Sequence, residues 1–264
     1  FLCHTAISIS SFQVVVLVPT TILAAQHAKS FADRFAYTPY VVAQLSRFVT
    51  PEQSREVKDR LRRGEVNIVI GTHGVLHKSV QIPELGLLIL DEEHRFGVKD
   101  KERLKRLRAN LDVLSMTATP IPRTLHMSLS GLRSMSVIAT PPRDRLSVYT
   151  RMVRVSETMV REAIIYELRR GGQVFFVHNR VETIETRKRW LYSILPELSI
   201  GVAHGKMKPS DLEEVMWGFT EGAFNVLLCT TLIENGIDIP RANTIMIDTW
   251  WSWMATVARS RRGS

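Results

Sequence analysis

Two adjacent carboxylates, Asp91 and Glu92, follow the uninterrupted apolar run 87–90. Such a run predicts a strand that is covered on both faces, as in a parallel sheet. Ligands of open α/β sheets bind outside the carboxyl ends of the strands. Carboxylates placed there can hold Mg²⁺, usually through water, and can orient a water for attack on a phosphate. The alternative interpretation is a solvated acidic turn after a core strand.

The elements that would position these carboxylates alternate along the chain. Apolar runs of strand length occur at 14–18, 66–70, 113–116, 173–177, 200–203 and 225–229, and segments of helical character lie between many of them. This alternation predicts an α/β fold with parallel sheets and right-handed crossovers. The Pro-rich, charged stretch 139–145 lacks periodicity. We therefore expect two lobes, residues 1–142 and 151–264, with a linker at 143–150.

Three helix starts carry capping signals. Thr50 precedes Pro51 and has Gln53 three residues later, which predicts a capping box and a helix that stops at Gly64. The segment 210–213, Ser-Asp-Leu-Glu, predicts a second capping box. If residues 19–21 form an ordinary strand-to-helix turn, Thr21 is the expected cap of the helix over 22–34.

The composition favours a polyanionic partner. The chain has 264 residues and a formal net charge of +9, and it contains two cysteines. A basic balance favours nucleic acid, although many soluble proteins are basic without binding it. Two cysteines give no disulfide framework and suit a reducing cytosol, so we expect a cytoplasmic protein. No apolar run reaches the eighteen or so residues that span a bilayer, and no membrane partner is expected.

The stretch Asp91-Glu92-Glu93-His94 resembles motif II of superfamily 2 helicases and translocases. The resemblance implies that Asp91 serves Mg²⁺ through water, that Glu92 polarises the attacking water, and that His94 couples the nucleotide site to the DNA site. The segment 117–125 resembles motif III. In that family its small hydroxyl residues, here Thr117 and Thr119, link hydrolysis to DNA movement.

Residues after other predicted strands resemble further motifs of the same family. The segment 19–21 resembles motif Ia, 71–76 motif Ib, 178–180 motif IV and 230–240 motif V. Hydroxyls and free N–H groups at a helix start suit phosphate, and glycine permits close approach of a nucleic-acid backbone. The expected DNA-binding residues are Pro19, Thr20, Thr21, Gly71, Thr72, His73, Asn179, Arg180, His204, Gly205, Thr230 and Thr231. Within motif V, Gly236 and Asp238 are expected to serve nucleotide binding or coupling.

Taken together, residues 14–248 resemble the translocase module of the bacterial transcription-repair coupling factors. The features that favour this family are the acidic third residue of motif II, the Gly-Ile-Asp-Ile-Pro sequence at 236–240, and the stretch 204–231. The resemblance implies two RecA-like lobes with ATP and Mg²⁺ between them and double-stranded DNA across both. It also implies RNA polymerase and excision-repair proteins as partners, through regions outside this chain.

The chain departs from the family pattern in three places. No Gly-rich phosphate loop ending in Gly-Lys-Ser/Thr occurs, and Asn235 stands where the family usually has Thr. Beyond Asp248 the resemblance stops, so that 249–264 is interpreted as an aberrant tail and motif VI, with its arginine fingers, is missing. Both lobes are therefore expected to be incomplete at the chain ends. We expect this chain, as given, to hydrolyse ATP poorly or not at all.

Two other interpretations stay open at this point. One is the related branch-migration helicase that remodels forks, which belongs to the same class but acts on a different substrate. The other is a non-catalytic, basic DNA-binding remnant, which would bind duplex with steep salt dependence and without any effect of nucleotide. An unrelated α/β hydrolase or Rossmann enzyme is disfavoured, because neither Gly-x-Ser-x-Gly nor Gly-x-Gly-x-x-Gly occurs.

Overall fold

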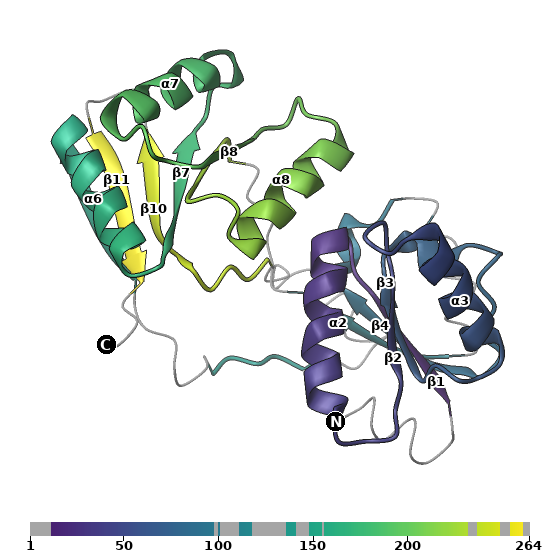
Figure 1. Cartoon of the computed structure of the whole chain (residues 1–264). Coiled ribbons are helices and arrows are strands. Elements are labelled where there is room, and N and C mark those ends of the chain that lie inside the picture. The colour runs from purple at the N-terminus through teal and green to yellow at the C-terminus, as the bar shows by residue number, and fades with distance from the viewer. Residues whose placement is uncertain are drawn as a thin grey trace. The chain divides into compact units, whose positions relative to one another are not determined.

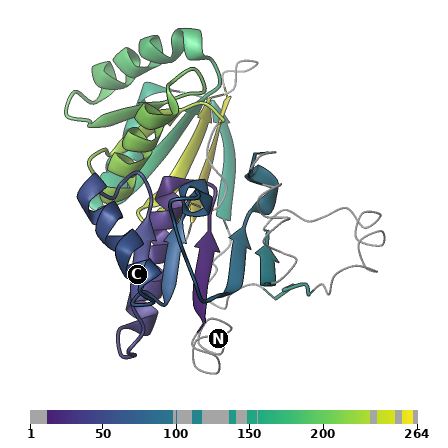
Figure 2. The same cartoon turned by 90° about the vertical axis from the view of Figure 1, so that its right-hand side faces the viewer.

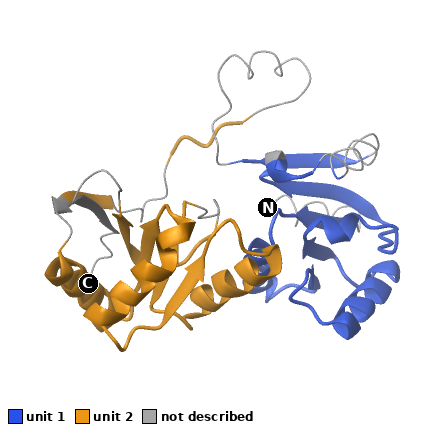
Figure 3. Ribbon diagram, turned by 90° about the horizontal axis from the view of Figure 1, so that it is seen from above, with its two compact units in different colours: residues 1–134 blue, residues 135–264 orange. Residues whose placement is uncertain are grey.

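The computed structural model describes residues 12–97, 100, 111–117, 136–140, 148–154, 156–231, 237–248 and 254–260. The chain divides between Ser134 and Met135 into two compact units (Figure 3). The predicted boundaries at 142 and 150 stay predictions, because most of the intervening chain lies outside the described residues, although the last three linker residues belong to a strand. Within the described ranges, no helix is long and apolar enough to cross a membrane.

Unit 1 contains a five-stranded sheet of order β2-β3-β1-β4-β5 in which every pairing is parallel. The strands are β1 (Gln13–Leu17), β2 (Val42–Leu45), β3 (Ile68–Gly71), β4 (Leu85–Asp91) and β5 (Asp112–Met116). The helices in its described part include α2 (Thr21–Phe35) and α3 (Pro51–Arg62), with short 3-10 turns η1 (His73–Leu76) and η2 (Glu93–Arg95). The predicted α/β fold is confirmed for this unit.

Both faces of this sheet are covered, which explains the uninterrupted apolar runs. Leu61 of α3 packs with Val15 of β1 and Leu88 of β4 on one face. Figure 1 shows α2 on the opposite side of the sheet from α3. Residues 87–90, the strand that leads into the carboxylates, are all buried.

The helix starts agree with the predictions in one case and differ in two. Thr50 and Gln53 form the predicted capping box. At α2 the cap is Thr20, whose Oγ1 accepts a hydrogen bond from the backbone N–H of Leu23, so the prediction of Thr21 was wrong by one residue. The box predicted at Ser210 was also wrong, because Pro209 begins that helix and the Ser210 hydroxyl donates to Asp211 instead.

Unit 2 contains a six-stranded sheet of order β6-β11-β10-β7-β9-β8. Its strands are β6 (Val148–Arg154), β7 (Gln173–His178), β8 (Ile200–Ala203), β9 (Val226–Cys229), β10 (Ala242–Asp248) and β11 (Met254–Ser260). The four strands β8, β9, β7 and β10 are parallel, as predicted. β11 pairs antiparallel with β10 and with β6, so the tail expected to be aberrant supplies a strand and the sheet is mixed.

In the described part of unit 2, three helices cover the sheet. The helices α6 (Glu157–Arg169) and α7 (Ile184–Ile194) pack on one face, where Ile164 and Leu191 share a core with Phe176. α8 (Pro209–Glu221) covers the other face, where the rings of Phe219 and Phe175 meet edge to face at 5.0 Å between centroids. Figure 2 shows these helices (green) against the strands of unit 2.

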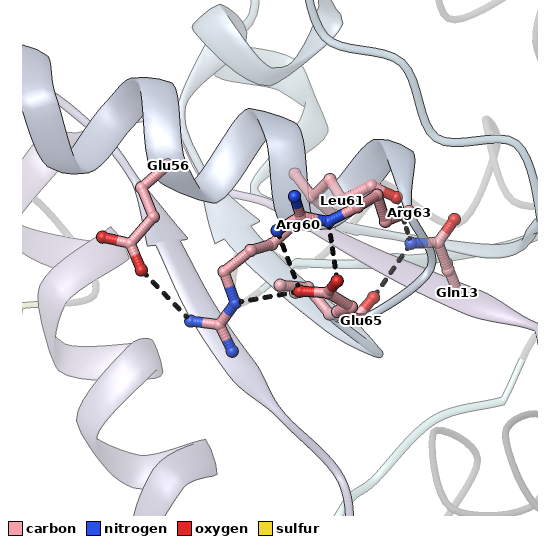
Figure 4. Close-up of polar contacts among 7 residues, drawn as sticks. Gln13, Glu56, Arg60, Leu61, Arg63 and Glu65 are labelled. Atoms are coloured by element: carbon pink, nitrogen blue, oxygen red, sulfur yellow. Dashed lines mark hydrogen bonds and ion pairs between the residues drawn. The ribbon is translucent and has the colours of Figure 1, made fainter.

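The two units repeat one arrangement of four strands. The order β2-β3-β1-β4 in unit 1 corresponds to β8-β9-β7-β10 in unit 2. The first residue of each central strand is a buried glutamine. The Nε2 of Gln13 donates to the carbonyls of Leu61 and Val66, both at 2.9 Å (Figure 4).

In unit 2, the Nε2 of Gln173 donates to the carbonyls of Phe219 and Phe224, both at 2.7 Å. Each glutamine thus joins its central strand to the last turn of a covering helix. It also joins that strand to the segment that leads into the neighbouring strand of the sheet, which is β3 in unit 1 and β9 in unit 2.

Candidate nucleotide and nucleic-acid sites

Asp91 is the last residue of β4, and its side chain keeps 20% of its surface exposed. Its Oδ2 lies 3.1 Å from Nε2 of His27, which comes from the second turn of α2. His27 was not among the predicted site residues. It lies 64 residues from Asp91 along the chain, and no motif marks it, so only the fold brings the two together.

Glu92 begins the turn after β4 in a left-handed backbone conformation, with φ 51° and ψ 49°. Among the described non-glycine residues it is the one with a positive φ. Its side chain is buried, its backbone N–H donates to the carbonyl of Met116 (2.9 Å), and its Oε2 accepts a hydrogen bond from the Thr117 hydroxyl (3.0 Å). A non-glycine residue in this conformation costs about 1–3 kcal/mol and is frequent at functional sites.

The predicted motifs II and III therefore meet at one edge of the sheet. Besides the contact of Thr117 with Glu92, the Ser115 hydroxyl donates to Oε2 of Glu93 at 2.8 Å. Thr119, Gly236 and the side chain of His94 lie outside the described residues. Asp238 is described and exposed, in the segment before β10.

The carboxylates fit a magnesium ion that is held mainly by a nucleotide. His27 engages Oδ2 of Asp91, and no described residue engages Oδ1. Among the described residues, no group of three or more His, Cys, Asp or Glu side chains could hold a metal ion on its own. Mg²⁺ in nucleotide-hydrolysing sites commonly keeps several waters and takes one or two carboxylates plus phosphates, which agrees with this donor set.

The expected DNA-binding residues of unit 1 follow β1 and β3, which are parallel neighbours, so they lie at one edge of the sheet. Pro19 is partly exposed, Thr20 caps α2, and Thr21 is buried. Thr72 is partly exposed and His73 is exposed.

Gly71 has a different explanation from the predicted one. A Cβ at this position would collide with the backbone carbonyl of Leu45 in the neighbouring strand β2. The glycine is therefore explained by close packing within unit 1, whether or not a nucleic-acid backbone approaches it.

The expected DNA-binding residues of unit 2 also gather at one sheet edge, after β7, β8 and β9. The backbone N–H of Thr231 donates to Oδ1 of Asn179 at 3.1 Å, which joins predicted motif V to predicted motif IV. The backbone N–H of Thr230 donates to the carbonyl of Ala203, next to His204 and Gly205. Lys206 binds Glu182 at 2.7 Å, which joins the loop after β8 to the loop after β7.

The same edge holds a polar cluster that the sequence analysis missed, formed by His178, which is buried, Arg187 and Asp248, which are partly buried, and Thr183, which is exposed. Nδ1 of His178 and Nη2 of Arg187 both lie 2.8 Å from Oδ2 of Asp248, and Nε2 of His178 lies 2.7 Å from the Thr183 hydroxyl. Burial alone would raise the pKa of Asp248, but the hydrogen bond from His178 and the charge of Arg187 outweigh it and lower the pKa. The signal was available, because Asp248 ends an apolar strand just as Asp91 does.

Two families match this arrangement. Residues 2–128 match the DEAD/DEAH box helicase family and residues 156–263 match the helicase conserved C-terminal domain. The second match extends past Asp248, where the resemblance was expected to stop. A structure of RecG bound to a three-way DNA junction is similar, with a TM-score of 0.70 and 32% identity over 92% of this chain and 33% of that chain. A structure of Dbp5 from S. cerevisiae bound to RNA shares the fold, with a TM-score of 0.57 and 17% identity.

The fold and these matches define the chain as a superfamily 2 helicase-type protein with two RecA-like lobes. Curated transcription-repair-coupling factors are more similar to it than the RecG structure: 54% identical in Myxococcus xanthus, 51% in Escherichia coli and 52% in Bacillus subtilis, each over 89% of this chain. The chain belongs to the family of transcription-repair coupling factors. It spans about a fifth of the length of these relatives.

Proposed function

We propose that the protein to which this chain belongs is an ATP-dependent double-stranded DNA translocase of transcription-coupled repair, which acts in the cytoplasm on stalled RNA polymerase. The observation that carries the proposal is the similarity to coupling factors across the segment that holds Asp91, Glu92 and the loops of unit 2. RNA polymerase and excision-repair proteins would bind through regions outside this chain.

In the proposed mechanism, Asp91 would hold Mg²⁺ through its water shell, while His27 fixes the Asp91 carboxylate through Oδ2. When bound with ATP, Mg²⁺ would neutralise charge on the phosphates. Glu92 would polarise the attacking water. The Thr117 hydroxyl fixes the Glu92 carboxylate, so a displacement of predicted motif III would change the orientation of the catalytic group.

We further propose that the chain as given hydrolyses ATP slowly. The phosphate loop supplies backbone N–H groups and a lysine that grip the phosphates, and its sequence pattern does not occur in these 264 residues. An arginine finger contributes about 10³–10⁵ in rate, and no motif VI is recognised here. Asp91 and Glu92 cannot replace either group, because carboxylates repel a triphosphate that lacks its cations.

Two measurements on this chain test the proposal: equilibrium binding to plain duplex and to a three-way junction over a range of salt concentrations, and DNA-stimulated ATP hydrolysis. We expect duplex binding with steep salt dependence and no preference for the junction. We expect hydrolysis well below the 1–10³ s⁻¹ of typical enzymes.

Each alternative predicts a different result. A clear preference for the junction would favour the fork-remodelling helicase. If ATP and Mg²⁺ leave the affinity for duplex unchanged, the interpretation as a non-catalytic remnant is favoured. Hydrolysis at an ordinary motor rate, abolished by Glu92→Gln, would contradict the proposed slow hydrolysis, and failure to bind any DNA would contradict the proposed function itself.

A further inference from the structure

The cluster of His178, Thr183, Arg187 and Asp248 fixes both ends of one short loop. His178 is the last residue of β7, and Thr183 ends the short 3-10 turn η4 (Val181–Thr183) directly before α7, so four residues, 179–182, lie between His178 and Thr183. The imidazole of His178 joins the two ends through its bond to Thr183. Arg187, one turn into α7, binds the same Asp248 oxygen as His178, so the helix that follows the loop is also fixed to the end of β10.

The loop that is fixed in this way carries Asn179 and Arg180, two of the expected phosphate-binding residues. Asn179 is exposed and already accepts a hydrogen bond from the N–H of Thr231. A loop with few free torsions loses little entropy when it binds, so anchoring its ends strengthens each contact that it makes.

We propose that His178, Asp248 and Arg187 are positioning residues for DNA binding: they hold the loop 179–182 so that Asn179 and Arg180 meet the phosphate backbone of a duplex. This inference rests on the proposed DNA translocase function and adds residues to it. His178 and Asp248 are largely buried, and the Arg187 guanidinium is bound to Asp248, so none of the three needs to touch DNA.

Asp248→Asn distinguishes this positioning role from a simple effect of charge, because the two predict opposite changes in the affinity for duplex DNA. Removing a negative charge from a DNA-binding surface would by itself strengthen binding to duplex. If Asp248 positions the loop, binding instead weakens, by about 10- to 100-fold, which is the loss expected when one charge-assisted phosphate contact is lost.

The salt dependence supplies a second measurement, which a general loss of structure would not mimic. Each lost phosphate contact reduces the slope of log K against log salt by about 0.9. We therefore expect the slope for Asp248→Asn to fall by about one contact, although no cationic side chain has been removed. Glu162→Gln, on the exposed side of α6, removes the same charge far from the loop in sequence and should neither weaken binding nor change the slope.

The experiment is a titration of fluorescent duplex with the whole chain at several salt concentrations, with circular dichroism to show that each variant is folded. If Asp248→Asn does not fold, Arg187→Gln is compared with Arg189→Gln, which removes the same charge from the same helix but contacts Thr186 instead. We expect the larger loss for Arg187→Gln.

Equal losses for those two variants, or Asp248→Asn binding as tightly as wild type with an unchanged slope, overturn the inference alone. A wild-type chain that binds no duplex overturns both this inference and the proposed function.

Discussion

The two units place a carboxylate at the same point of the fold and surround it differently. β4 and β10 lie next to the central strands β1 and β7, and Asp91 and Asp248 are their last residues. Asp91 has one described partner, His27, whereas Asp248 has both His178 and Arg187 on the same oxygen. In unit 2 the side chains of His178 and Arg187 thus occupy the position that in unit 1 is left partly open. One strand end is suited to an external cation, and the other is suited to holding a loop.

The glutamines at the start of β1 and β7 show the opposite contrast, because here unit 1 supplies more partners than unit 2. Gln13 makes three hydrogen bonds, because its Oε1 also accepts from the N–H of Glu84. Gln173 makes two, and its buried Oε1 has no partner among the described residues. Both units therefore use a buried glutamine to join the same elements, but in unit 1 both polar atoms of its side chain are hydrogen-bonded.

The largest expected effect comes from replacing these glutamines by methionine, which keeps the length but removes the hydrogen bonds. At about 1 kcal/mol per bond, Gln13→Met should cost unit 1 about 3 kcal/mol and Gln173→Met should cost unit 2 about 2 kcal/mol. All five tryptophans lie in residues 135–264, so fluorescence during urea unfolding reports on unit 2. Amide exchange of β1 reports on unit 1. Equal costs would remove the distinction between the two glutamines.

A smaller effect is expected at Asp91. His27→Phe fills the same space but leaves Oδ2 without its donor, and loss of a residue that orients a metal-binding carboxylate typically weakens metal affinity about 10–100-fold. We expect about a tenfold loss in Mn²⁺ affinity in the presence of ATP, measured from the free Mn²⁺ signal by electron paramagnetic resonance. His77→Phe is the matched control, because His77 is exposed and its side chain bonds only to Ser79 among the described residues. Identical affinities for both variants would show that His27 does not act on Asp91.

The smallest effect is a pH dependence in unit 2. The pKa of Asp248 in the folded chain lies below its usual value, so its contribution to stability is present above the unfolded pKa and is lost as pH falls through the folded pKa. Asp248→Asn should therefore cost about 1 kcal/mol at pH 7 and progressively less below about pH 4. Urea midpoints from tryptophan fluorescence at a series of pH values test this. A cost that stays constant down to the acid limit would contradict the ion-pair explanation.

The sequence predicted most strands and the position of Asp91 and Glu92, because apolar runs and strand ends are local signals. It could not predict His27, since the contact depends on how α2 packs against the sheet. It also placed the start of α8 at Ser210, where a capping pattern competes with Pro209, and the proline at the first helical position prevailed. The antiparallel β11 was missed because the sequence of that segment departs from the family pattern.

The cluster around Asp248 was missed for another reason. The rule that drew attention to Asp91, a carboxylate after an apolar strand, applies equally to residues 244–248. It was used only where a second acidic residue followed. What the sequence could not provide was the set of partners, because His178 lies 70 residues away and its role depends on the order of strands in the sheet.

The left-handed backbone of Glu92 has a consequence for how this chain evolves. Glycine adopts φ near 51° without steric cost, so Glu92→Gly would relieve strain on folding. In a gene that no longer encoded an active enzyme, the mutation Glu92→Gly would therefore be tolerated. Folding stability alone would not select glutamate at this position, and its presence supports the proposed role of Glu92 in hydrolysis.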